Sequence, residues 1–274
     1  MILVNGKPED RISISDRGLN YGDGLFETIA FRNGVAEFID AHIQRLVDGC
    51  IRLNIPFQQL ELLSTELDSI YQSLKDVDSV IKIVITRGSG GRGYLADNTA
   101  EPSRIISTHA YPSYPKSYQQ QGVSVRLCQH KLSENPTLAG LKHLNRLDNV
   151  IARNEWSDEN IAEGLMFDQS NHLIEGTMTN VFIVKSNQLI SPKIKTSGVN
   201  GILRTQIIQI ANQLGITFKE GVLSQTDLKN ADEVFVCNSI NGIWPVKNII
   251  DFEKTLSVGP VTQQLQHVLL EVKR

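Results

Sequence analysis

The sequence has few of the residues that build disulfide frameworks or metal sites. Its three cysteines, Cys50, Cys128 and Cys237, include no CxxC pair, so neither a zinc knuckle nor a thioredoxin-like site is expected. Each cysteine lies in or beside an apolar run, which is typical of small buried side chains in a reducing compartment. The six histidines form no HExxH motif, and we expect no metal site.

Long hydrophobic runs are also missing. The N-terminus turns polar after MILV, too soon for a signal peptide, and no apolar stretch approaches the roughly 20 residues that span a bilayer. A net charge of −3, from 27 basic and 30 acidic side chains, provides no general reason to bind nucleic acid or an anionic membrane. With 41% hydrophobic residues the chain can form a core, and we expect a cytoplasmic globular protein.

Two glycine-based motifs lack the neighbouring sequence that their usual functions require. Residues 87–94, RGSGGRGY, contain GxGxxG directly after an apolar run, but polar residues and Pro102 follow where a dinucleotide-binding motif needs a helix. Two arginines without repetition or basic surroundings do not make an RNA-binding RGG tract. A glycine-rich loop between two strands remains, and no GxSxG hydrolase elbow is present.

Helical and strand patterns mix irregularly along the chain. Apolar residues at helical spacing predict a helix with Asp40 as its N-cap and Pro56 as its stop, and a second helix over 58–74. Alternating β-branched residues predict a strand over 79–86. Further strands are expected at 25–32, 105–110, 123–129, 164–167, 173–175, 181–184 and 232–237, and further helices at 147–156, 202–214 and 261–272. Without a regular βαβ rhythm the predicted class is α+β.

The segment 111–122 is the best candidate for a linker, because it has two prolines and little apolar content. It would separate a smaller N-terminal α/β domain, 1–110, from a larger C-terminal domain of mixed strands with helices, 123–274.

Three further segments carry residues suited to chemistry. In AGLKHLNRLD, 139–148, Lys142 falls between an apolar strand and an apolar helix, where catalytic groups are commonly mounted. Glu175 ends one predicted strand and Asn180 starts the next. SGVNGILR, 197–204, is a glycine-bearing turn leading into a helix, whose free N–H groups suit a phosphate. Taken singly, each of these residues is compatible with an ordinary solvated role.

Together with RGSGGRGY and the AHIQRL of 41–46, these segments resemble the fold-type IV pyridoxal-phosphate family. That family comprises branched-chain aminotransferases, D-amino acid aminotransferases and aminodeoxychorismate lyases, and the segments are most like the bacterial lyases. The likeness runs from Asn5 to about Val246 in the family's order. It implies a two-domain fold, with a large C-terminal domain that binds pyridoxal 5'-phosphate.

The resemblance also implies residue roles. Lys142 would bond to the cofactor aldehyde and, once displaced by substrate, move protons. Glu175 would face the pyridine nitrogen, Arg45 would bind the phosphate, and Thr28 would donate to the departing enolpyruvate. The other implied cofactor contacts are Asn180, the backbone at Ile202 and Leu203, and the Ser239 hydroxyl, and the implied substrate contacts are Phe26, Arg92 and Asn241.

The likeness to the lyases implies 4-amino-4-deoxychorismate as substrate, 4-aminobenzoate and pyruvate as products for folate synthesis, and functional coupling to aminodeoxychorismate synthase. Arg92 corresponds to an arginine that reaches a substrate carboxylate from the neighbouring subunit in the D-amino acid aminotransferases, which implies a homodimer with the active site near the interface. Phe26-Glu27 is also similar to the aminotransferase branches, so a D- or branched-chain amino acid aminotransferase is the alternative. A non-catalytic binding member of the fold is a third possibility.

Overall fold

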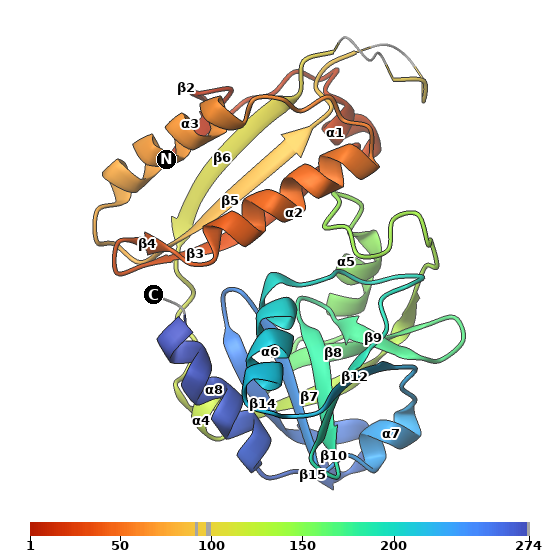
Figure 1. The fold of residues 1–274 in the computed structure, drawn as a ribbon. Helices are drawn as coiled ribbons and strands as arrows, with labels where there is room; N and C mark the ends of the chain where they lie inside the picture. The colour runs from red at the N-terminus through yellow and green to blue at the C-terminus, as the bar shows by residue number, and fades with distance from the viewer. Residues whose placement is uncertain (91–92, 97–99, 273–274) are drawn as a thin grey trace. The chain divides into compact units, whose positions relative to one another are not determined.

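The computed structural model describes residues 1–90, 93–96 and 100–272, and the chain divides into two units (Figure 1). Unit 1 comprises Met1–Pro112 and Lys142–Asn145, and unit 2 comprises Ser113–Leu141 and Arg146–Arg274. The short segment Lys142–Asn145 therefore belongs to unit 1, although residues of unit 2 flank it in the chain. Both units combine helices with a sheet, so the predicted α+β class is confirmed.

Unit 1 is an antiparallel sheet with the strand order β2-β1-β6-β5-β3-β4. The strand predicted over 79–86 is confirmed at both ends, because its alternating β-branched residues fit a pleated, half-buried surface. The elements are β1 (Ile2–Val4), β2 (Lys7–Pro8), α1 (Arg17–Tyr21), β3 (Gly24–Arg32), β4 (Val35–Ala36), α2 (Ile39–Arg52), α3 (Leu60–Leu74), β5 (Ser79–Thr86) and β6 (Ser103–Ala110).

Both long helices of unit 1 cover the same face of its sheet. Successive strand residues point to opposite faces, and on one face Glu27 of β3 bonds to α2 while Arg104 of β6 bonds to Glu66 of α3. The apolar core of the unit lies between, with Ile29 and Phe31 fully buried. Residues of alternate register, among them Phe26 and Thr28, lie on the other face and are half-buried.

The start of α2 differs from the prediction. Asp40 is not the N-cap: the helix begins at Ile39, and Phe38 caps it in the left-handed conformation with φ 53°. Asp40 lies instead in the first turn, where its negative charge still favours the helix dipole. The helix ends at Arg52, before Pro56, and the glycine-rich loop after β5 joins two antiparallel strands, as expected.

Unit 2 is built on a mixed sheet with the order β12-β11-β10-β13-β14-β7-β8-β9, and β15 pairs with β14. The pairs β11–β12, β14–β7 and β7–β8 are parallel and the others antiparallel. The elements are α4 (Ser117–Gln120), β7 (Val123–Leu132), α5 (Leu147–Arg153), β8 (Ile161–Asp168), β9 (Leu173–Gly176), β10 (Asn180–Lys185), β11 (Gln188–Pro192), α6 (Ile202–Gln213), β12 (Phe218–Gly221), α7 (Gln225–Lys229), β13 (Glu233–Asn238), β14 (Gly242–Ile249), the 3-10 helix Ile250–Phe252, β15 (Lys254–Thr255) and α8 (Pro260–Val272).

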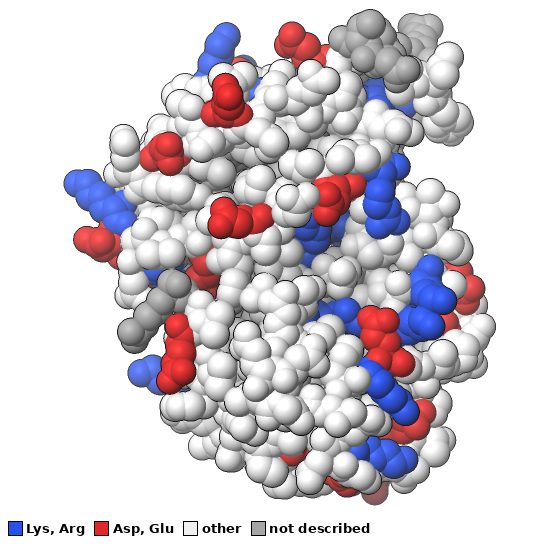
Figure 2. All heavy atoms as spheres, viewed as in Figure 1, with Lys and Arg blue, Asp and Glu red and all other residues white. Residues whose placement is uncertain are grey.

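The core of unit 2 lies among β7, β8, β10, β13 and β14, where Phe167, Val236 and Trp244 are buried. The short helix α4 falls within the segment expected to be a linker, and its Tyr118 packs edge-on against Trp244 at 5.1 Å between ring centroids. On the face shown in Figure 2, acidic and basic side chains are interspersed.

In the part of the chain that the structure describes, no helix combines the length and the hydrophobicity needed to cross a bilayer.

Candidate active site

Lys142 lies in a short segment that forms an isolated antiparallel bridge with β3 of unit 1. The Phe26 amide donates to the Lys142 carbonyl at 2.9 Å, and the Leu144 amide donates to the Gly24 carbonyl at 3.0 Å, so Leu25 and His143 pair as antiparallel neighbours. Phe26 and Lys142 are therefore opposite each other and share a face. Lys142 Nζ lies 4.3 Å from the centroid of the Phe26 ring.

Thr28 lies two residues further along β3, on the same face as Phe26. It is half-buried and pairs with Lys82 of β5, whose Nζ lies 5.5 Å from the Phe26 ring centroid. The structure thus brings three predicted residues, Phe26, Thr28 and Lys142, to the sheet face that α2 and α3 leave uncovered.

Arg45 lies on α2, on the opposite side of β3. Its Nε donates to Glu27 Oε1 at 2.7 Å and its Nη2 to Glu27 Oε2 at 2.5 Å. His42, one helical turn earlier on α2, bonds through Nδ1 to Glu27 Oε2 at 2.6 Å. The buried face of α2 therefore includes a histidine beside its apolar residues.

The Glu27 carboxyl is ionised in this setting. Burial acts to raise its pKa, but the hydrogen bonds and charges of His42 and Arg45 outweigh burial and hold the pKa below the usual value. Burial lowers the pKa of His42, against the pull of Glu27, and the positive charges of Arg45 and Lys142 lower it further. His42 is therefore neutral, with Nδ1–H donating to Glu27, and its Nε2 has no hydrogen-bond partner among the described residues.

Glu175 ends β9 in unit 2 and is buried. Its Oε2 accepts from the Val199 amide at 2.8 Å, which ties the strand to the turn before α6. Arg146 lies within electrostatic reach: burial lowers the pKa of this guanidinium, and the Glu175 charge opposes that shift. A carboxylate held by a backbone N–H and a nearby cation can hold a proton on a ring nitrogen.

Two glycines allow the turn before α6 to approach these side chains. Gly198 has φ +88°, and a Cβ there would lie 2.7 Å from Ile174 Cγ2 and 3.3 Å from Glu175 Oε2. At Gly201 a Cβ would lie 2.0 Å from Asn180 Oδ1. Asn180 Nδ2 donates to the Val199 carbonyl at 2.9 Å. Val199 is therefore bonded to Glu175 through its amide and to Asn180 through its carbonyl. Gly140, two residues before Lys142 in the chain, bonds to the same turn through Gly198 and Asn200.

The N-terminus of α6 has the form of an anion-binding site. Within the described residues no side chain caps this helix, whose N-cap is Gly201. Ile202 and Leu203 are buried, so the N–H groups of the first turn are withdrawn from water. The buried Ser197 Oγ, just before the turn, has no partner in the described part of the chain. Buried donors without acceptors fit a phosphate.

Ser239 and Asn241 lie in the turn between β13 and β14. Asn238 shapes this turn: its Oδ1 accepts from the Ile240 amide at 3.0 Å and the Asn241 amide at 2.7 Å, and its Nδ2 donates to the Met178 carbonyl. Ser239 is half-buried, and Asn241 is buried with an Nδ2 that lacks a partner among the described residues. Glu175, Asn180, Ile202 and Leu203 thus meet around one turn, while Ser239 and Asn241 lie in a second turn of the same unit.

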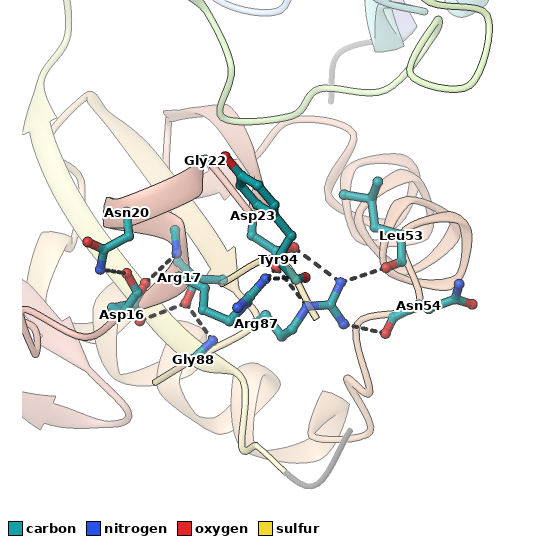
Figure 3. Close-up of polar contacts among 12 residues, drawn as sticks. Asp16, Arg17, Asn20, Gly22, Asp23, Leu53, Asn54, Arg87, Gly88 and Tyr94 are labelled. Atoms are coloured by element: carbon teal, nitrogen blue, oxygen red, sulfur yellow. Dashed lines mark hydrogen bonds and ion pairs between the residues drawn. The ribbon is translucent and has the colours of Figure 1, made fainter. Parts of the chain in front are cut away.

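The glycine-rich loop is anchored by arginines with structural roles. Asp23 accepts from Arg87 Nε at 2.8 Å and from Arg17 Nε at 3.0 Å, and Arg17 also donates to the Gly93 and Tyr94 carbonyls (Figure 3). Burial acts to raise the pKa of Asp23, but the two arginines outweigh it and lower the pKa. Arg92, predicted to contact substrate, lies outside the described residues.

No role in the site was assigned from the sequence to Glu27, His42, Arg146 or Glu163. Glu163 of β8 is fully buried and accepts from both the amide and the hydroxyl of Thr177 and from the hydroxyl of Thr179, and so holds the loop between Glu175 and Asn180. The only available signal was weak: His42 and Arg45 are three residues apart on one helix, opposite a strand glutamate.

Comparison with known proteins identifies relatives over nearly the whole chain. The amino-transferase class IV family matches residues 24–249. The aminodeoxychorismate lyase of Vibrio harveyi is 36% identical over 269 residues, covering 97% of this chain and 98% of the relative. The D-alanine aminotransferase of Bacillus licheniformis is 28% identical, covering 98% of this chain and 95% of the relative.

Among solved structures, the 4-amino-4-deoxychorismate lyase of Pseudomonas aeruginosa is similar with a TM-score of 0.94 and 42% sequence identity. The match covers 99% of this chain and 98% of that one. Both units described above are therefore shared with an enzyme of similar length.

Proposed function

This chain belongs to the amino-transferase class IV family, and we propose that it is a pyridoxal 5'-phosphate-dependent lyase that converts 4-amino-4-deoxychorismate to 4-aminobenzoate and pyruvate. The observation that carries the proposal is Lys142 beside Phe26 on the sheet face opposite α2 and α3, in a chain 36% and 42% identical to two proteins named as lyases of this substrate. Folate synthesis would consume the aminobenzoate.

The described residues fit the cofactor. The uncapped, buried N-terminus of α6 fits its phosphate, the Glu175 carboxylate fits its protonated ring nitrogen, and Lys142 provides an amine. Bound pyridoxal phosphate supplies an aldehyde that bonds to amines and a ring that accepts electrons when the bound substrate loses a proton. In our proposal the remaining holders of the cofactor are Arg45, Asn180, the amides of Ile202 and Leu203, and the Ser239 hydroxyl.

The residues divide the proton transfers among them. Lys142 would provide the amine that holds the cofactor and, once the substrate amine has replaced it, would take the proton from the substrate carbon that bears nitrogen. Glu175 keeps the proton at the pyridine nitrogen. Thr28, on the same sheet face as Phe26 and Lys142, donates a proton to the departing enolpyruvate, which leaves as pyruvate while the substrate ring becomes aromatic. Phe26, Arg92 and Asn241 bind the substrate.

The aminotransferase alternative rests on the 28% identity to a D-alanine aminotransferase and on the pair Phe26-Glu27. Glu27, however, points into α2 and is buried there, away from the face that carries Phe26 and Lys142. The pair therefore gives no reason to favour an amino-acid substrate over aminodeoxychorismate.

We also propose that the protein acts as a homodimer in the cytoplasm and takes its substrate from aminodeoxychorismate synthase. Ile14, Leu19 and Tyr94 support a subunit interface on unit 1, because they are large apolar or aromatic side chains that are mostly exposed. In the dimer Arg92 would serve the partner's site. The three free, buried cysteines are compatible with a reducing compartment.

The deciding experiment supplies the purified protein with chorismate, glutamine and an aminodeoxychorismate synthase, and measures 4-aminobenzoate and pyruvate. The proposal predicts equal amounts of both products, dependent on pyridoxal phosphate. In parallel, D-alanine and leucine are offered with 2-oxoglutarate. Transamination without aminobenzoate would establish the alternative instead, and no reaction in either assay would support a binding role.

A further inference from the structure

Glu27 is a buried acid that no step of the proposed reaction uses. It is 1% exposed, as is His42, and it lies on β3 between Phe26 and Thr28, with its side chain on the opposite face. Among the described residues, its carboxylate accepts hydrogen bonds from His42 Nδ1 and from Nε and Nη2 of Arg45. This group of three residues, Glu27, His42 and Arg45, is called the Glu27 cluster below.

The geometry of the cluster fixes the direction of Arg45. Nε and Nη2 of the guanidinium lie along one edge, and both donate to Glu27, at 2.7 and 2.5 Å. A two-point contact of this kind sets the plane of the planar guanidinium, which a single bond would not do. The arginine side chain is 15% exposed, so it is not withdrawn completely from a ligand.

His42 in turn fixes Glu27. Its neutral ring donates from Nδ1 to Oε2 at 2.6 Å, and Arg45 Nη2 bonds to that same oxygen. Because His42 carries no charge, the cluster has one negative and one positive group, and Glu27 offsets the charge of Arg45 in a setting poor in water. A buried ion pair is weak evidence for stability as such, because desolvation offsets much of its attraction. The contribution of this ion pair is instead to orient the Arg45 guanidinium.

We propose that Glu27 is a positioning residue that aligns Arg45 with the cofactor phosphate, and that His42 holds Glu27 in place for that task. The inference rests on the proposed function in one respect, since it takes Arg45 as a phosphate ligand. Glu27 touches neither cofactor nor substrate and acts through Arg45 alone.

The test compares two ligands that differ only in the phosphate. The full-length apoprotein is titrated with pyridoxal 5'-phosphate and with pyridoxal, and binding is followed by visible absorbance. Glu27→Gln should weaken binding of pyridoxal phosphate by roughly tenfold or more, the scale of a lost charge-assisted hydrogen bond. Binding of pyridoxal should change little, because pyridoxal has no phosphate for Arg45 to hold.

A matched control is available in the same unit. Glu66 is a second buried carboxylate that holds an arginine, Arg104, at 2.7 Å. Glu66→Gln should leave the ratio of the two affinities at the wild-type value, because a general loss of packing affects both ligands alike. The double variant Glu27→Gln with Arg45→Ala should bind pyridoxal phosphate no more weakly than Arg45→Ala alone, since residues that act as a unit are not additive.

Equal loss of affinity for both ligands in Glu27→Gln, or additive losses in the double variant, would overturn the positioning role. If Glu27→Gln does not fold, Glu27→Asp retains the buried charge but withdraws it from Arg45, and it should show the same selective loss. These measurements use binding only. A wild-type protein that binds pyridoxal phosphate but makes no aminobenzoate would therefore refute the lyase proposal and leave the test of Glu27 intact. A wild-type protein that does not prefer pyridoxal phosphate over pyridoxal would refute the phosphate role of Arg45, and this inference with it.

Discussion

Glu27 in unit 1 and Glu163 in unit 2 are both buried carboxylates, but their surroundings differ. Glu27 is bonded to an arginine and a histidine, and its pKa is lowered although burial acts in the opposite direction. Among the described residues, Glu163 accepts from amides and hydroxyls, of Gly164 and of residues 177–179, and burial raises its pKa in spite of those bonds. A nearby positive charge, more than the number of hydrogen bonds, decides in which direction the pKa of a buried carboxylate is shifted.

The same contrast runs through the two sets of candidate residues. In unit 1 charged side chains hold one another, as in the Glu27 cluster and in the Arg17, Asp23 and Arg87 network. In unit 2 backbone amides, glycines and neutral side chains form the turn around Glu175 and Asn180. Unit 1 should therefore be sensitive to loss of charge, and unit 2 to added side-chain volume.

The largest effect is expected at Lys142. Lys142→Ala should lower the rate of aminobenzoate formation by roughly a thousandfold or more, the scale seen when a covalent catalytic group is removed. Lys131→Ala is the control, because Lys131 Nζ lies 4.8 Å from the Phe167 ring in a comparable lysine–aromatic contact in unit 2. Steady-state assays with saturating cofactor measure both. A Lys142→Ala enzyme that retained a tenth of the activity would refute its role.

Glu175→Gln should lower kcat by about a hundredfold, because a neutral amide no longer stabilises the proton on the pyridine nitrogen. The amide oxygen of glutamine can still accept from the Val199 amide, so the turn should remain and the unfolding midpoint should change little. An unchanged kcat would remove Glu175 from the mechanism. A fall in stability alone would make its role structural.

Gly201→Ala tests the sensitivity of unit 2 to volume. The added Cβ would lie 2.0 Å from Asn180 Oδ1, and overpacking of this kind should cost about 1–3 kcal/mol in the free energy of unfolding and weaken cofactor binding. In Gly221→Ala the new Cβ would meet Ile190 Cγ2 at 3.4 Å, an ordinary contact, so this variant is the control. Urea titrations of both variants give the comparison. Equal losses of unfolding free energy in the two variants would contradict the expected sensitivity of unit 2 to added side-chain volume.

The smallest effects are the opposite pH dependences of the two buried acids. The lowered pKa of Glu27 contributes stability that is present above its ordinary value of 4.5 and is lost as pH falls through the folded-state pKa. The raised pKa of Glu163 contributes stability that is present below 4.5 and is lost as pH rises through its folded-state pKa.

On acidification, the difference in unfolding free energy between wild type and Glu27→Gln should therefore shrink. The unfolding free energy of the wild type should instead rise relative to that of Glu163→Gln. Each slope is at most about 1.4 kcal/mol per pH unit. Urea unfolding of the apoproteins from about pH 2 to about pH 8 measures them. Slopes of the same sign would mean that the pKa values of the two acids are not shifted in opposite directions.

Many helices and strands could be predicted because the spacing of apolar and β-branched residues follows the period of the local element. The β-branched run of β5 is found where it was expected, and the apolar spacing of 202–214 gives α6, Ile202–Gln213. The strand β14, Gly242–Ile249, was missed, since Pro245 interrupts a run that otherwise reads as a strand. The helix α1, Arg17–Tyr21, is too short to show a period.

The motifs around Lys142, Glu175 and Asn180 were visible in the sequence, and the structure gives each a defined setting. The pairing of Lys142–Asn145 with β3 was not predictable, because it joins segments more than a hundred residues apart through backbone bonds that any side chains could make. The Glu27 cluster depends on the register between β3 and α2, and its members taken singly are typical surface residues.

The lysine that carries the cofactor is the residue on which the proposed function depends most. Reduction of the purified holoprotein with borohydride should fix the cofactor permanently to its lysine, and peptide mapping should then find the label in the peptide that contains Lys142. A label on any other lysine, or no label on a protein that has taken up pyridoxal phosphate, would contradict the account.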